Sequence, residues 1–324
     1  MSANIGDLVD RDFREYLEPT DNIVSYTTIT NSDLLDDAVT TGLTDTATEV
    51  TFNGDLLSVE EEDALDAGTI IEIGQELMLC TDLNAVTNTI TVIRGVRGTT
   101  AAEHSQGSTL KITPPFARIN VFNAIKDQVE NLYPTLFAVE VQTLTSATGW
   151  VALEGADDNN RIVAPLKAIS QFTTLASGNE TTVQFRGVSV ELIDVPTSVT
   201  STGKAVQFSG IQTGVPVHVT FKKKFGTVTN ESTTLADVGL ETEYEPIIMA
   251  GVAAQMVAGR DIPTVTAEYI TQQIAVGNYP VGSSNSLRNS LLQYQQLLVQ
   301  QARKDLRARY PEPVQMNSVV YPSA

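Results

Sequence analysis

Cysteine and histidine, which carry many metal sites and much nucleophilic chemistry, are almost absent from this chain of 324 residues. There is one cysteine, Cys80, and there are two histidines, His104 and His218. A single cysteine excludes an internal disulfide framework and a thiolate metal cage, so we expect Cys80, in a strand pattern, to be a small buried hydrophobe. The histidines are far apart in sequence, and a metal cluster or a Ser-His-Asp triad would need long-range convergence. We therefore predict no enzyme, no cofactor and no metal site.

Positive charge is also scarce, and it lies away from the front of the chain. Lys and Arg number 20 against 39 Asp and Glu, a net charge of −19, of which residues 1–100 carry −16. A field of this sign repels phosphate, so we expect no tight binding of DNA. Basic residues gather instead at 222–224 and 303–309, and we expect them to face protein partners.

Long apolar runs are missing too. No stretch approaches the roughly 20 apolar residues of a transmembrane helix, and the first residues lack the basic and apolar regions of a signal peptide. We expect a protein that neither spans a membrane nor is secreted through a signal peptide.

The sequence does contain a clear β pattern between residues 70 and 112. Aliphatic and β-branched residues alternate at 70–73, 77–81, 90–92 and 110–112, which predicts strands. After the third of them we expect Gly95 and Gly98 to adopt positive φ in a turn, with Arg94 and Arg97 alternating outward beside them. No Gly-Lys-Ser/Thr ending follows, which disfavours a phosphate-binding loop.

The sequence of this segment resembles that of a small β-module in tailed-bacteriophage virion proteins. It reads Ile73-Gly74-Gln75-Glu76-Leu77-Met78, then Ile90-Thr91-Val92-Ile93-Arg94-Gly95-Val96-Arg97-Gly98, then Thr99-Thr100-Ala101-Ala102-Glu103-His104. Many neck, tail and baseplate components of such phages carry the same succession: Gly, any residue, Glu, an apolar residue and Met, then Arg-Gly, a Gly-Thr turn and Ala-Ala-Glu-His. A looser resemblance to helical parts of neck proteins extends over residues 246–250 and 302–306.

This resemblance implies a structural protein of the phage particle, of the head-to-tail connector or adaptor type. Such proteins form homo-oligomeric rings below the portal, dock helices on the neighbouring ring and carry β domains on the outside. The implied partners are further copies, the portal and other neck or tail proteins, with DNA passing through without tight binding. The implied location is the virion, assembled in the bacterial cytoplasm. The chain departs from many neck adaptors in its larger size, which includes a further β domain.

The patterns along the chain predict an α+β multidomain protein. It has a helical connector-like region, formed by N-terminal, central and C-terminal helices, a small acidic β-module and an inserted β-sandwich. The predicted segments are an N-terminal amphipathic helix (1–20), the acidic β-module (21–114), a linking helix (115–136), the β-sandwich (137–230), a C-terminal helical region (231–312) and an extended tail (313–324).

The C-terminal region has helical patterns at 245–259 and 265–275 and then a long amphipathic helix from Ser286, ended by Pro311. Its apolar stripe consists of Leu287, Leu291, Tyr294, Leu298, Ala302, Leu306 and Tyr310. The stripe could be core of the chain itself, but its glutamine-rich flank and basic end suit contact with another subunit. We predict that a subunit or ring contact is made by Leu287, Leu291, Tyr294, Leu298, Arg303 and Arg307.

Two other functions stay open. Trp150, the only tryptophan, is expected in the core, but in a β-sandwich it could stack on a sugar. The alternative is therefore a tail, baseplate or capsid-decoration protein with a glycan- or partner-binding sandwich, and an enzyme such as a cell-wall hydrolase is the weaker rival. The run Asp-Asn at 157–160 could offer oxygens to Ca²⁺ but lacks EF-hand spacing, and we expect a polar hairpin turn there.

Overall fold

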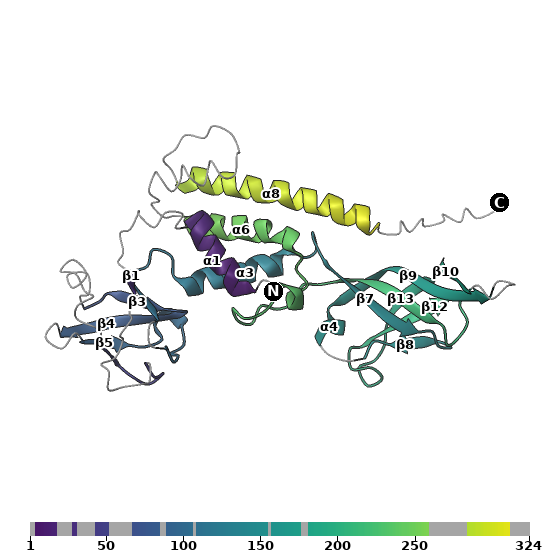
Figure 1. Ribbon diagram of the computed structural model, residues 1–324, viewed down its shortest axis with the longest axis horizontal. Helices are drawn as coiled ribbons and strands as arrows, with labels where there is room; N and C mark the ends of the chain where they lie inside the picture. The colour runs from purple at the N-terminus through teal and green to yellow at the C-terminus, as the bar shows by residue number, and fades with distance from the viewer. Residues whose placement is uncertain are drawn as a thin grey trace, which may run out of the picture. The chain divides into compact units, whose positions relative to one another are not determined.

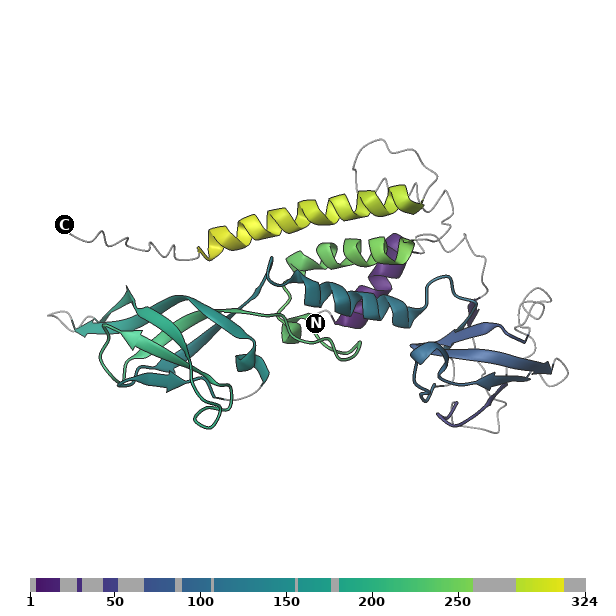
Figure 2. The same cartoon turned by 180° about the vertical axis from the view of Figure 1, so that it is seen from behind.

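The chain is a mixed α and β protein, as the computed structural model shows (Figure 1 and Figure 2). The structure describes residues 4–17, 28–30, 43–51, 67–84, 89–105, 108–154, 157–175, 181–258 and 284–311. Two compact units divide the chain. The module unit comprises 6–126 and 249–292, and the sandwich unit comprises 1–5, 127–248 and 293–324. Both units are discontinuous in sequence, which a linear division into six segments does not anticipate.

A six-stranded antiparallel sheet forms the body of the module unit, in the order β1-β6-β3-β4-β5-β2. Its strands are β1 (Thr28–Thr30), β2 (Glu49–Thr51), β3 (Ile70–Ile73), β4 (Glu76–Asn84), β5 (Thr89–Ile93) and β6 (Thr109–Ile112). The four strands predicted between residues 70 and 112 are confirmed, and β1 and β2 extend the sheet at both edges. One face is packed with aliphatic side chains such as Ile71, Ile90 and Val92, together with Cys80, whose predicted burial is confirmed.

The N-terminal helix and the linking helix are also present. Helix α1 (Ile5–Asp12) continues into a π-helical turn, η1 (Phe13–Leu17). The apolar side chains of this segment are buried, as expected of an amphipathic helix: Ile5, Leu8, Val9, Phe13 and Leu17. Helix α3 (Arg118–Leu132) ends just before Tyr133 and Pro134. The buried Glu72 of β3 accepts the backbone N–H of Arg118 at 2.6 Å, which satisfies one of the free donors at the start of α3.

Two sheets that share one core make up the predicted β-sandwich. The first has the order β10-β9-β13-β7 and the second the order β11-β12-β8. The strands are β7 (Ala138–Thr145), β8 (Trp150–Ala152), β9 (Ile162–Leu175), β10 (Thr181–Gly187), β11 (Ser189–Asp194), β12 (Lys204–Ser209) and β13 (Pro216–Lys223). Phe221 and Val219 of one sheet and Val206 of the other lie in the same buried cluster. The expected hairpin turn at 157–160 is wrong, because these residues form a short helix, α4 (Asp157–Asn160).

The C-terminal helical pattern is present where the structure describes it. After α5 (Leu235–Val238) and the 3-10 turn η4 (Thr242–Tyr244) comes α6 (Glu245–Val257), which is buried nearly all round, as expected of a helix without a polar face. The long helix α8 (Ser284–Arg309) begins two residues before its predicted start. The helix predicted at 265–275 and the tail at 313–324 lie outside the described residues.

Candidate functional site

The motif of residues 73–104 folds around the buried carboxylate of Glu76, the first residue of β4. Its side chain is only 1% exposed, and Arg94 donates to it through both edges of the fork, from Nε to Oε1 at 2.6 Å and from Nη2 to Oε2 at 2.7 Å. The backbone N–H of Gly95 reaches Oε1 at 3.2 Å, and that of Ala102 reaches Oε2 at 3.0 Å. His104 donates from Nε2 to Oε2 at 2.9 Å. Glu76 therefore joins three segments of the motif at one point.

The prediction that Arg94 points outward beside Arg97 is wrong. Its side chain is 7% exposed, and its remaining N–H groups donate to the backbone carbonyls of Thr44 and Ala47, at 2.7 and 2.9 Å, and of Ala102, at 2.6 Å. All five donors of the guanidinium are thereby used. The physical reason is the buried carboxylate, which needs a bidentate cation; Arg97, by contrast, is exposed.

Electrostatics and hydrogen bonding keep Glu76 ionised. Burial by itself would raise its pKa, but the hydrogen bonds from Arg94, Ala102 and His104 and the charge of Arg94 lower it below the usual value. Because protein donors occupy both carboxylate oxygens, no position is left for a substrate or an attacking water. The arrangement holds loops together and is not built for acid–base catalysis.

The turn glycines are confirmed in the backbone conformation predicted for them. Gly95 has φ 64° and Gly98 has φ 83°, with Arg97 between them at φ 55°. A Cβ at Gly95 would meet the carbonyl oxygen of Thr99 at 3.0 Å, whereas at Gly98 it would meet open space. The two glycines thus differ: Gly95 is needed for close approach and for its φ, and Gly98 for its φ alone.

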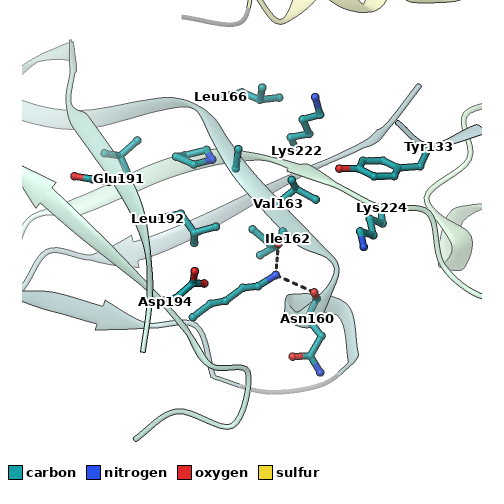
Figure 3. Close-up of a pocket in the computed structure, with 14 residues that line it drawn as sticks. Tyr133, Asn160, Ile162, Val163, Leu166, Glu191, Leu192, Asp194, Lys222 and Lys224 are labelled. Carbon is teal, nitrogen blue, oxygen red and sulfur yellow. Dashed lines mark hydrogen bonds between the residues drawn. The ribbon is translucent and has the colours of Figure 1, made fainter. Parts of the chain in front are cut away.

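A pocket of about 860 Å³ lies on the β-sandwich, beside β9, β11 and β13 (Figure 3). Charges of both signs line it, among them Asp194, Lys204 and Lys222. Lys204 donates from Nζ to the carbonyl of Asn160 at 2.9 Å and to that of Ile162, and the pKa of Lys204 is lowered by burial against the opposing charge of Asp194. These bonds fix the ammonium group of Lys204 on the backbone, so Lys204 is a positioned charge and not a free nucleophile.

The basic run at 222–224 does not face one direction, because residues alternate across a strand. Lys223 is buried and paired with Glu140. Lys222 lies over the ring of Phe137 at 4.6 Å, and Lys224 over the ring of Tyr133 at 5.5 Å. Both Lys222 and Lys224 line the pocket of about 860 Å³ (Figure 3). Of the three lysines, one is thus buried in an ion pair and the other two lie over aromatic rings.

A second, smaller pocket of about 220 Å³ in the sandwich unit brings three basic side chains together. We call it the basic pocket: its polar rim consists of Lys222, Arg303 and Arg307, and its remaining lining of Pro134, Thr135, Phe137 and Leu306. Arg303 and Arg307 are one turn apart on α8, and no carboxylate of the described chain forms an ion pair with either. The structure thus places two predicted contact residues beside Lys222, which the sequence had put in a separate group.

The apolar stripe of α8 is buried unevenly. Leu287 and Leu291 are buried within the chain, which assigns them to its own core and leaves them no free surface for a subunit contact. Tyr294 and Leu298 are half-buried, and the neighbouring Leu297 is 59% exposed. Gln295 donates to Gln128 at 2.8 Å and to the carbonyl of Ile247 at 3.2 Å. The predicted contact stays a prediction and now rests on the later part of the helix.

Trp150 is exposed, contrary to its expected place in the core. It lies in β8 at the edge of the three-stranded sheet, and 41% of its surface is accessible.

The other histidine, His218, forms a hydrogen bond through Nδ1 with the hydroxyl of Thr143 on the neighbouring strand at 2.8 Å. Within the described part of the chain, no three His, Cys, Asp or Glu side chains come close enough together to hold a metal ion.

The motif contains both Glu76 and His104, but its sequence does not show that the two side chains form a hydrogen bond. The available signal was an acidic residue directly before the apolar run 77–80 at the start of a strand. Comparison with protein-family models found no match to this chain, and comparison with curated proteins found none either.

Of the helices that the structure describes, none has the length and hydropathy needed to cross a bilayer.

Proposed function

We propose that this protein is a non-enzymatic structural component of a tailed-phage particle, a ring-forming head-to-tail adaptor that joins portal and tail and lets DNA pass. The observation that carries the proposal is the buried network of Glu76, Arg94 and His104. It accounts for the residues of the phage-type motif as a structural junction, since every polar group of Glu76 and Arg94 is used to hold loops. A motif whose polar groups are used for architecture fits a virion component better than an enzyme.

Helix α8 supports the same proposal. Leu297 is exposed, Tyr294 and Leu298 are half-buried, and the exposed Gln293, Gln296 and Gln300 lie on the same part of the helix. Apolar side chains at a surface with polar, uncharged neighbours are typical of protein–protein contacts. In this function the later part of α8 takes part in the contacts with other subunits.

Electron microscopy tests the proposal directly. Negative-stain images of the purified protein should show rings, and gold-labelled antibody against it should mark the neck of the particle. Label at the tail tip, the baseplate or the capsid surface would contradict the adaptor function.

The second candidate is a tail, baseplate or capsid-decoration protein with a glycan- or partner-binding sandwich, and the exposure of Trp150 favours it. An accessible indole on a sheet edge can stack on a sugar ring. Because Trp150 is the only tryptophan, its fluorescence reports on this site alone. Titration with host-surface glycans should shift the emission if the site binds them, and a glycan array with Trp150→Ala as control should lose the signal. A flat titration would exclude glycan binding at Trp150.

A further inference from the structure

The outer face of the β-module carries a small acidic surface with an exposed isoleucine beside it. Glu49 of β2 and Asp82 of β4 are both register partners of Thr91 on β5, so the three side chains lie in one row across the sheet. Ile93, two residues further along β5, points to the same face and is 52% exposed. We call Glu49, Asp82 and Ile93 the acidic patch.

The acidic patch is exposed and not neutralised within the described chain. The neighbouring Val50 and Val92 point to the opposite, buried face, so the patch is the solvent side of the sheet. Neither Glu49 nor Asp82 forms an ion pair with a described basic residue. An exposed isoleucine beside two carboxylates is a poor solvated surface and a good anchor for a partner with an apolar centre and a basic rim.

The basic pocket has that composition. Phe137 and Leu306 provide apolar lining, and Lys222, Arg303 and Arg307 provide three positive charges around it. A volume of about 220 Å³ admits a side chain, not a domain. An apolar lining suits an isoleucine with flanking carboxylates better than a nucleic-acid backbone, which is bound mainly through exposed charge.

We infer that the acidic patch of one copy docks in the basic pocket of a second copy. Patch and pocket are different surfaces of the same chain, so the contact is head-to-tail, and repeated head-to-tail contacts generate a ring when the rotation closes. The inference deepens the proposed adaptor function and rests on it, because it names the surfaces through which copies associate. Helix α8 contributes to it through Arg303, Leu306 and Arg307.

Complementation between two full-length variants tests the contact. The pocket variant is Arg303→Gln/Arg307→Gln and the patch variant is Glu49→Gln/Asp82→Asn; all four residues are exposed, so folding should be kept, as far-UV circular dichroism would verify. In sedimentation-velocity runs the wild type should form oligomers, and each variant alone should associate at least about tenfold more weakly. An equimolar mixture should give 1:1 dimers that grow no further, since only one intact patch and one intact pocket meet.

Two exposed residues outside both surfaces supply the controls, Lys304→Gln on α8 and Glu130→Gln on α3, and both should associate like the wild type. Variants that oligomerise normally, or a mixture that stays monomeric, would overturn the inference. Loss of duplex-DNA binding in the pocket variant with unchanged oligomers would make the pocket a phosphate site instead. A wild-type protein that is monomeric in solution yet labelled at the neck would overturn the contact and leave the adaptor function standing.

Discussion

At the scale of single residues, the buried ion pair of Glu76 and Arg94 holds the β-module together. Replacing Glu76 by Gln would leave the guanidinium buried with an incomplete set of acceptors and no counter-charge. We expect Glu76→Gln to lower the free energy of unfolding by about 3–5 kcal/mol, the range found when one partner of a buried pair is removed. Chemical denaturation measures this, with Glu49→Gln on the exposed face as the control, expected within about 0.5 kcal/mol of wild type.

The same residue gives a pH dependence with a definite sign. Because the folded pKa of Glu76 lies below its usual value, its contribution to stability is present above the unfolded pKa and is lost as the pH falls through the folded pKa. Melting curves from neutral to acidic pH should therefore converge for wild type and Glu76→Gln. A constant gap between the two curves down to the lowest pH would argue against an ionised Glu76.

Asp12, at the end of α1, predicts the opposite behaviour. Its carboxyl is fully buried, neither oxygen has a hydrogen-bond partner, and burial, assisted by the charge of Glu15, raises its pKa well above the usual value. In the unfolded chain the carboxyl of Asp12 ionises near pH 4, whereas in the folded protein it keeps its proton to higher pH. Asp12 therefore lowers the free energy of unfolding as the pH rises above about 4.

We expect Asp12→Asn to raise the stability at neutral pH, on the order of 1–3 kcal/mol, with the gain shrinking as the pH approaches 4. Thermal melts of both proteins across this range measure it. A variant that is less stable than wild type at pH 7 would show that ionised Asp12 has a partner in solution.

Gly98 separates backbone strain from steric clash. Its φ of 83° is unfavourable for a residue with a side chain, but a Cβ there meets no atom within 4 Å. Gly98→Val should therefore destabilise the module by roughly 1–3 kcal/mol through strain alone. Gly95→Val should cost more, because a Cβ there also meets Thr99. Equal melting temperatures for wild type and Gly98→Val would refute the backbone explanation of this turn.

At the scale of elements, the apolar side chains at the start of helix α8 are buried, whereas those around Leu298 are half-buried or exposed. Leu298→Asp places a charge on the half-buried section, so we expect a small loss of stability, about 1 kcal/mol, but failure to enter particles. Leu306→Asp, at a buried position, is the contrasting variant and should be destabilised by several kcal/mol. Incorporation of Leu298→Asp at the wild-type level would remove the later part of α8 from the contact.

The elements were largely predictable from the sequence, whereas the contacts between distant segments were not. Alternation gave the strands of the module and most of the sandwich, and helical spacing gave the N-terminal, linking and long C-terminal helices, because these patterns are local. The meeting of Glu76 with His104 and of Lys222 with Arg303 depends on tertiary packing. Arg94 was expected to be exposed and is buried, and Trp150 was expected to be buried and is exposed. Residue type alone does not fix the direction of a side chain at a strand end or on a sheet edge.

At the scale of the whole molecule, the net charge predicts weak binding of duplex DNA. The chain carries a net charge of −19, and four basic side chains are among those already engaged in ion pairs: Arg94 with Glu76, Arg118 with Asp10, Lys223 with Glu140, and Arg309 with Glu241 and Glu243. Few cations are left to replace the counterions of a duplex. An adaptor around a moving genome benefits from such weak adhesion, because each phosphate that is captured has to be released again.

The free protein should therefore give no detectable shift of duplex DNA at physiological salt, and at low salt only a weak one. Gel-shift titrations at both salt concentrations measure this, and a slope of log affinity against log salt below about 3 would match the few cations at the surface. The matched variants are Lys222→Gln/Lys224→Gln, which removes the two lysines that line the larger pocket of the sandwich, and Lys223→Gln, whose lysine is buried with Glu140. Tight, salt-sensitive binding that is lost only in the double variant would make the protein a component that grips DNA, and would contradict a role in its free passage.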